Sequence, residues 1–201
     1  PIGAGIAFAN KYKKNKSVCF TYFGEGAANQ GQVYEAFNMA SLWKLPVVFV
    51  IENNQYAMGT SMVRASSTEE MFARGLAFNI PGKAVNGMNV LDVAKEAAHA
   101  ADHCRAGKGP FILEMKTYRY RGHSMSDPAK YRTREEVKKV REENDPIDTL
   151  RSILIEKHKI SEKQFKATDA EIKEIVTEAS DFALNSPEPD IEELWTDVYA
   201  G

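Results

Sequence analysis

Cysteine is scarce in this chain: Cys19 and Cys104 are the only 2 among 201 residues. Both lie in apolar, periodic segments, and their spacing matches neither a disulfide framework nor a metal site, which favours a reducing compartment. The sequence also lacks a run of 18 apolar residues, so we expect no membrane-spanning helix. With 43% hydrophobic residues, 27% charged residues and a net charge of −2, the composition is that of an ordinary soluble globular protein.

Basic residues are absent after Lys173, whereas eight Asp and Glu residues follow it. The opposite excess lies between Arg105 and Arg141, where the sequence has eleven Lys and Arg residues against four acids. Such a segment could attract nucleic acid, a phosphate-bearing cofactor or an acidic partner. No nucleic-acid-binding motif accompanies the charge, so we do not expect nucleic acid to be a ligand.

The order of the predicted elements indicates an α/β fold. Residues 17–23 and 47–52 are apolar and rich in strand-forming residues, and the segment 29–44 between them repeats its apolar residues every 3.6 positions, as a helix does. A strand–helix–strand unit of this kind implies two parallel strands joined by a right-handed crossover. A helix at 90–106 and a strand at 110–117 continue the alternation.

Two segments without periodicity are predicted to be functional loops. Residues 55–83 form a long loop that becomes ordered around a ligand, with one short helix near 68–75, and residues 118–131 form a second, polar loop. We therefore expect an α/β domain over 1–131 and a helical extension over 132–201. The helices expected in that extension lie at about 133–143, 146–156 and 168–184.

Three polar stretches follow the predicted strands: Gly24-Glu25-Gly26, Glu52-Asn53-Asn54 and 118–128 (YRYRGHSMSDP). In a parallel sheet, ligands bind beyond the carboxyl ends of the strands, and glycine lets the backbone approach them closely. A carboxylate at one strand end and an amide at the next can supply two oxygens to Mg²⁺, which prefers oxygen ligands and completes its shell with phosphate and water. A basic loop nearby would balance the remaining phosphate charge. The sequence therefore predicts a metal–diphosphate site.

Each stretch also has a simpler interpretation. A Gly-x-Gly sequence alone is typical of a structural turn, and Asn53-Asn54 suits a turn because Asn tolerates a left-handed backbone. Gly24-x-Gly26-x-x-Asn29 nearly matches a dinucleotide fingerprint, in which Glu52 would bind ribose, but an asparagine replaces the third glycine. The combination is more specific, because the 26 residues between Gly26 and Asn53 suffice for one crossover helix and one strand.

That combination, Gly-acid-Gly followed after 26 residues by Asn-Asn, resembles the thiamine-diphosphate motif. Residues 24–61 (GEGAANQGQVYEAFNMASLWKLPVVFVIENNQYAMGTS) and 117–132 (TYRYRGHSMSDPAKYR) resemble the α subunits of pyruvate dehydrogenase E1 components, which belong to the thiamine-diphosphate-dependent 2-oxo acid dehydrogenases. The resemblance runs through essentially the whole chain. It implies the thiamine-diphosphate-binding fold, a mostly parallel sheet flanked by helices, with a C-terminal helical extension.

The same resemblance implies two cofactors, thiamine diphosphate and Mg²⁺. Glu25 stands where the family has a metal-binding Asp, Asn54 would supply a second side-chain ligand, and the backbone carbonyl of Tyr56 would supply a third. Glu25 is one methylene longer than Asp, and a rotamer change could absorb the extra reach, a water could bridge it, or metal affinity could fall. Gly26 and Ala27 are implied to lie against the diphosphate, and Gly24 is implied to belong to the cofactor-binding residues.

In the second loop, Arg119 and His123 match family positions that face the diphosphate and the mouth of the active site. The fork of N–H donors on arginine suits phosphate, and His123 is the candidate for a proton-handling or lipoyl-facing role. Ser61 and Ser124 match positions that are phosphorylated in mitochondrial relatives, although this loop is one residue shorter than theirs. A separate pair of histidines, His99 and His103 at i and i+4, is expected on a helix surface without a metal.

The resemblance implies oxidative decarboxylation of pyruvate, with transfer of the acetyl group to a lipoyl group on an E2 component. It also implies a β subunit, in a heterotetramer of two α and two β subunits. Dehydrogenases of branched-chain 2-oxo acids or acetoin keep the cofactor motif, and the segment GHSMSDP favours pyruvate over them. A truncated, non-catalytic α-like assembly partner is the remaining alternative.

The start of the chain is unusual for such a subunit. The sequence opens on Pro1 with a helical pattern, and the N-terminal part expected of a family α subunit is missing. We therefore expect the 201 residues alone to lack dehydrogenase activity. Arg121 stands where animal relatives have His, which favours a bacterial cytoplasm over the alternative, a mitochondrial matrix.

Overall fold

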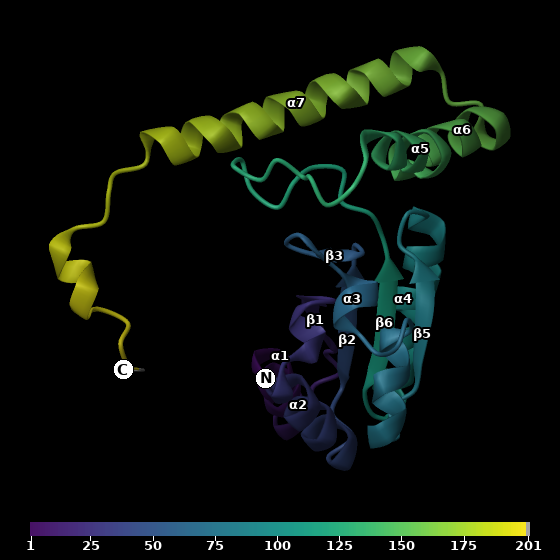
Figure 1. Ribbon diagram of the computed structural model, residues 1–201. Helices are drawn as coiled ribbons and strands as arrows, with labels where there is room; N and C mark the ends of the chain where they lie inside the picture. Colours follow the sequence, from purple (N-terminus) through teal and green to yellow (C-terminus); the bar gives the residue numbers. More distant parts are fainter. Residues whose placement is uncertain (200–201) are drawn as a thin grey trace. The chain divides into compact units, whose positions relative to one another are not determined.

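A parallel sheet forms the centre of the first of two compact units into which the computed structural model, which describes residues 1–199, divides (Figure 1). The first unit is Pro1–Leu150, and the second begins at Arg151. The four strands of the sheet lie in the order β1-β2-β6-β5, and all neighbours are parallel. Their bounds are β1 Cys19–Gly24, β2 Val47–Asn53, β5 Gly82–Asn86 and β6 Phe111–Lys116.

Helices cover both faces of this sheet. One face packs against α1 and α2, and the opposite face packs against α4 (Figure 1). The helices are α1 Ile2–Tyr12, α2 Gly31–Leu42, α3 Met62–Ala65, α4 Val90–Arg105, α5 Arg134–Asn144, α6 Pro146–His158 and α7 Glu162–Asn185. The predicted α/β class, a mostly parallel sheet flanked by helices, is confirmed.

The continuous apolar run of β2 follows from burial on both faces. Phe49 and Ile51 pack with α1 and α2, whereas Val48 and Val50 pack with α4, and none of the four is more than 2% exposed. A strand covered on one face alone would alternate apolar and polar residues. This arrangement places the strand end at Asn53 between the two layers, where it borders the candidate site.

The segment predicted as a long loop, 55–83, contains more regular structure than expected. Strands β3 (Tyr56–Ala57) and β4 (Thr60–Ser61) form an antiparallel hairpin, and residues 71–78 form a 3₁₀ segment. One edge strand of the sheet, β5, begins at Gly82, inside the predicted loop, and pairs with β6. The sequence GKAVN gives little sign of a strand because only Val85 is buried on this edge of the sheet.

In the second unit, α7 begins at Glu162, earlier than the predicted start near 168. The reason is a capping box: the backbone N–H of Ser161 donates to the side-chain oxygen of Gln164 at 2.9 Å, and the Ser161 side chain caps the backbone in return. None of the residues of α7 is buried. The predicted division into domains 1–131 and 132–201 stays a prediction.

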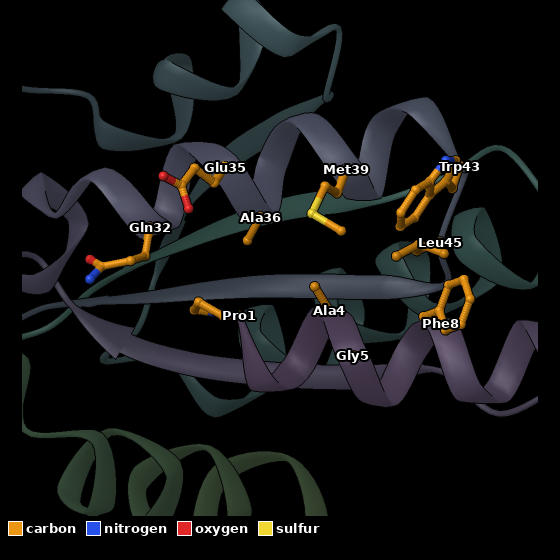
Figure 2. A pocket seen from close by; sticks show the side chains of 10 residues that line it. All are labelled: Pro1, Ala4, Gly5, Phe8, Gln32, Glu35, Ala36, Met39, Trp43 and Leu45. Carbon is orange, nitrogen blue, oxygen red and sulfur yellow. The ribbon is translucent and has the colours of Figure 1, made fainter.

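An apolar groove of about 400 Å³ lies between α1 and α2, lined by Phe8, Met39, Trp43 and Leu45 among others (Figure 2). It contains none of the residues predicted to bind a cofactor. Within residues 1–199, no helix is both long and apolar enough to cross a membrane.

Candidate functional site

Glu25 and Asn54 follow neighbouring strands and lie close together. Gly24 at the end of β1 is in register with Glu52 of β2, so the chain leaves both strands at the same edge of the sheet. The backbone N–H of Asn54 donates a hydrogen bond to Oε2 of Glu25 at 3.3 Å. The structure thus brings together the two residues that the sequence predicts as metal ligands, through the backbone of Asn54 and the carboxylate of Glu25.

The two asparagines shape the turn that follows β2. Oδ1 of Asn53 accepts a hydrogen bond from the backbone N–H of Gln55 at 3.1 Å, and Oδ1 of Asn54 accepts one from Tyr56 at 3.2 Å. Gln55 has a φ of +76°, in the left-handed region that few residues other than glycine adopt. The consecutive asparagines therefore have a local structural role whatever they bind, because such side chains stabilise turns.

The carboxylate of Glu25 is buried with little to balance its charge. Glu25 is 3% exposed. Within residues 1–199, its carboxylate accepts one hydrogen bond, from the backbone N–H of Asn54. Burial of a charge that is not paired is costly, so a cation at this edge would stabilise the site.

The neighbouring groups fit a metal that accepts oxygen ligands. No cluster of three or more His, Cys, Asp and Glu side chains occurs in the described part of the chain, so a cation beside Glu25 would also need amide, carbonyl, phosphate or water oxygens. Mg²⁺ accepts these ligands. The carbonyl of Tyr56 accepts a hydrogen bond from Nη1 of Arg119 at 3.1 Å, and a carbonyl oxygen has two lone pairs. The set of Glu25, Asn54 and Tyr56 therefore fits the predicted ion.

Gly26 and Gly24 differ in what surrounds them. A Cβ placed on Gly26 would lie 2.6 Å from the Cβ of Ala57, whereas one on Gly24 would meet nothing within 4 Å. Gly26 is required because the β3–β4 hairpin packs directly on the turn after β1. This packing provides a reason for glycine at position 26 that is independent of any ligand.

Arg119 connects the loop 118–131 to the β3–β4 hairpin by hydrogen bonds. Its Nη2 donates to the carbonyl of Met58 at 2.7 Å and to the hydroxyl of Tyr131 at 3.0 Å, in addition to the Nη1 contact with Tyr56. The guanidinium thus lies beside the Tyr56 carbonyl of the candidate metal site. Its predicted contact with diphosphate stays a prediction.

Asp127 organises the segment that carries His123. Its carboxylate accepts hydrogen bonds from the backbone N–H groups of His123 (2.7 Å) and Ala129 (2.8 Å) and from the hydroxyl of Tyr131 (2.8 Å). These bonds, led by that from His123, lower the pKa of Asp127 from 3.8 to about 2. The His123 side chain itself is exposed. The loop therefore presents this imidazole to solvent from a backbone that is held in place.

A cluster of aromatic residues supports the same loop, and sequence reasoning did not find it. The hydroxyls of Tyr118 and Tyr56 both donate to Oε1 of Glu136, at 2.6 and 3.2 Å. The guanidinium of Arg132 lies 5.2 Å from the ring centroid of Tyr118 and 5.8 Å from that of Tyr56. Burial, followed by the bond to Glu136, raises the pKa of Tyr118 to about 12. The available signal is the set of tyrosines in this segment with arginines nearby, because a guanidinium commonly stacks on an aromatic ring.

Asn53 and Glu114 form a second feature that was missed. Both residues are 0% exposed, and Nδ2 of Asn53 donates to Oε1 of Glu114 at 2.7 Å. Oε2 of Glu114 accepts from the backbone N–H of Phe72 at 3.1 Å. A glutamate within the apolar run PFILEMKT is the available signal, because a charged residue is rarely buried without a partner.

Comparison with known proteins identifies the family. The sequence model described as "Dehydrogenase E1 component" matches residues 1–192. The chain belongs to this family.

Curated relatives of the E1 family align with nearly the whole chain. The pyruvate dehydrogenase E1 component subunit alpha of Rhizobium meliloti (strain 1021) is 56% identical over 197 residues, which are 98% of this chain and 57% of the relative. That of Zymomonas mobilis is 55% identical over 201 residues, 100% of this chain and 56% of the relative. The testis-specific mitochondrial form of Rattus norvegicus is 52% identical over 200 residues, 99% of this chain and 51% of the relative. The chain thus spans a little over half the length of these relatives.

The two serines that match phosphorylated positions of relatives, Ser61 and Ser124, differ in solvent exposure. Ser124 is exposed, and its Oγ lies 3.1 Å from Oγ of Ser126. Ser61 is half-buried and pairs with Tyr56 in the β3–β4 hairpin. Phosphorylation of either stays a prediction.

The histidine pair of α4 lies away from the strand ends that form the candidate site. His99 is exposed, as expected, but His103 is half-buried, and its Nε2 has no hydrogen-bond partner within residues 1–199. Both rings pack edge-on against Phe111. Burial, and then the charge of Lys108, lowers the pKa of His103. His103 is thus less exposed than His99, because its ring packs against Phe111 on the side of α4 that faces the sheet.

Proposed function

We propose that this chain is part of the α subunit of a pyruvate dehydrogenase E1 component, which decarboxylates pyruvate with thiamine diphosphate and Mg²⁺. Family membership supports the cofactor, and the relatives named above are pyruvate dehydrogenase subunits. The structural observation that carries the proposal is the buried Glu25 carboxylate, 3.3 Å from Asn54 N at the neighbouring ends of β1 and β2.

Glu25, Asn54 and the Tyr56 carbonyl would hold Mg²⁺, and Gly24, Gly26 and Ala27 would border the diphosphate. Thiamine diphosphate supplies a carbon nucleophile and an electron sink for decarboxylation of a 2-oxo acid. The chain's own residues would bind the charged end of the cofactor and exclude water around it. Arg119 would hold the Tyr56 carbonyl in place and contribute positive charge near the phosphates.

His123 is proposed to face the entrance of the site. Its imidazole is exposed on a loop that Asp127 fixes through the backbone, so it can meet a large incoming group without rearrangement. We propose that it handles a proton, or contacts the lipoyl group, when the acetyl group passes to an E2 component. A β subunit would supply the rest of the active site, in a heterotetramer, and the chain alone would be inactive.

The test is a titration of thiamine diphosphate, with and without Mg²⁺, into the chain purified with its β subunit. We expect binding that depends on Mg²⁺, and at least about 10-fold weaker metal affinity in Glu25→Gln, since loss of groups around a metal typically costs that much. The matched control is Glu52→Gln, which removes an exposed carboxylate from the same sheet edge. Metal-independent binding, or equal losses in both variants, would contradict the proposed site.

Two further comparisons refine the proposal. Glu25→Asp removes the extra methylene; severalfold tighter binding would show that Glu fits the ion poorly, and unchanged binding would show that the site is adapted to it. Turnover of pyruvate, branched-chain 2-oxo acids and acetoin by the assembled complex tests the substrate. A preference for either of the latter would refute pyruvate specificity while leaving the cofactor assignment intact.

A further inference from the structure

The buried glutamate of β6 connects three segments that are distant in sequence. Glu114 accepts from Asn53 Nδ2 at 2.7 Å with one oxygen and from Phe72 N at 3.1 Å with the other, and it is 0% exposed. Asn53 ends β2, and Phe72 belongs to the 3₁₀ segment 71–78. Glu114 therefore ties the turn after β2 to the segment that packs beside it.

The carboxylate also determines the orientation of the Asn53 amide. A carboxylate accepts hydrogen bonds and does not donate them, so the NH₂ group of Asn53 must face Glu114. The amide oxygen then points toward Gln55, where it accepts from the backbone N–H and from Nε2, both at 3.1 Å. This contact accompanies the left-handed φ of +76° at Gln55, between the two proposed metal ligands Asn54 and Tyr56.

We propose that Glu114 is a positioning residue for the metal–diphosphate turn. It acts through Asn53, whose oriented amide holds Gln55 in the conformation that directs Asn54 and the Tyr56 carbonyl toward Glu25. The inference rests on the proposed function for the identity of the ligand, but the effect on the turn is expected without any ligand. Groups that orient metal ligands commonly affect metal affinity strongly even though they do not touch the metal.

Replacement of Glu114 by glutamine disrupts this network without changing its volume much. A glutamine has one acceptor oxygen, and both Asn53 Nδ2 and Phe72 N are donors. Whichever way the new amide turns, its NH₂ group therefore faces one of these donors, and a buried donor loses its partner. The Asn53 amide would then turn over or move, which leaves the N–H of Gln55 without its acceptor.

Exchange of the two residues restores the network. In Asn53→Asp with Glu114→Gln, the new carboxylate at 53 accepts from Gln55 and from the amide NH₂ at 114, and the amide oxygen at 114 accepts from Phe72. The hydrogen bonds of Gln55 and Phe72 and the net charge of the pair are retained. The double variant is thus a conservative rescue that a purely volume-based role would not predict.

The experiment has two readouts, on the chain assembled with its β subunit. Amide hydrogen exchange of residues 53–56, measured without ligand, reports the order of the turn. Electron paramagnetic resonance titration of Mn²⁺, in the presence of thiamine diphosphate, reports metal affinity. The matched control is Glu96→Gln. It removes another buried carboxylate, that of Glu96 on α4, which pairs with Lys83 of β5 at 2.6 Å.

We expect faster exchange at 53–56 and roughly 10- to 100-fold weaker Mn²⁺ binding in Glu114→Gln. Glu96→Gln should change neither quantity, and the exchanged pair should restore both. Wild-type exchange at 53–56 in Glu114→Gln, or equal effects of Glu114→Gln and Glu96→Gln, would overturn the inference. If Glu114→Gln does not fold, the exchanged pair decides: wild-type affinity supports the inference, and weak binding or failure to fold overturns it.

The two proposals fail in different ways. If the wild-type complex binds no Mn²⁺ with thiamine diphosphate, the proposed function is wrong, and hydrogen exchange still tests the control of the turn by Glu114. If the wild type binds and Glu114→Gln binds equally well, the proposed function stands and the positioning role is refuted.

Discussion

Substitution of Gly26 by alanine tests whether protein packing or a ligand requires the glycine. The added methyl carbon would lie 2.6 Å from the Cβ of Ala57. Two carbon atoms in good contact are about 3.5–4.0 Å apart, so the β3–β4 hairpin would have to move by about 1 Å. The backbone at Gly26 is helical, with φ −66° and ψ −45°, and alanine adopts it without strain. Any loss of stability therefore comes from the collision, because alanine at such a position otherwise stabilises by restricting the unfolded chain.

Overpacking of this kind typically costs about 1–3 kcal/mol. For a chain of this size, about 2–4 °C of Tm is lost per kcal/mol, so Gly26→Ala should lower Tm by about 2–12 °C. Gly24→Ala is the control, because a methyl group there meets nothing within 4 Å. The second variant, Gly26→Ala with Ala57→Gly, removes the colliding carbon and should recover most of the loss, less about 0.5–1 kcal/mol for glycine in a strand.

Thermal unfolding and thiamine-diphosphate titration should be measured on the same variants, assembled with the β subunit. Because the methyl group points at Ala57, the double variant should regain cofactor binding together with Tm. Recovery of Tm without recovery of binding would show that the glycine serves the approach of the ligand. An unchanged Tm in Gly26→Ala would refute the packing argument itself.

The remaining predictions concern the loop 118–131. The pKa of Asp127 is lowered to about 2 in the folded loop, from 3.8, so its contribution to loop order is complete above about pH 4 and is lost as pH falls toward 2. Protection of the His123 and Ala129 amides from hydrogen exchange should follow this profile, and Asp127→Asn should reduce that protection at pH 7. Protection that varies neither with pH nor with the substitution would contradict the proposed role of Asp127 in ordering the loop. His123→Ala should spare binding of thiamine diphosphate and Mg²⁺ but slow reductive acetylation of the E2 lipoyl group, and acetylation at the wild-type rate would exclude the proposed role.

The sheet and the strand-end site could be predicted because their signals are local. The run VVFVIE is apolar at consecutive positions, as a strand buried on both faces must be. Parallel strands joined by one helix bring their carboxyl ends to one edge, so the sequence alone predicts that Glu25 and Asn54 lie together. The hydrogen bond from Asn54 N to Glu25 agrees with that expectation.

Other features depend on residues that are far apart in the chain. The edge strand β5 carries little pattern of its own and exists because β6 offers free backbone groups along its side. The contacts of Arg119 also depend on a distant segment. The sequence predicts this arginine as a phosphate ligand, and in the structure it donates hydrogen bonds to two carbonyls of the β3–β4 hairpin. The partial burial of His103 likewise depends on Phe111, which lies on another element.

By itself, the sequence determined the fold class, the family and the two strand ends that approach each other, because hydrophobic periodicity and residue spacing are properties of short stretches. The tertiary structure alone decided how those strand ends are held. Glu114 reaches Asn53 across 61 positions, and Ala57 fills the space that Gly26 leaves open. Such contacts depend on distances between segments, and only the packed chain defines these distances. The partners of Glu114 and Gly26 therefore cannot be identified from the sequence around either residue.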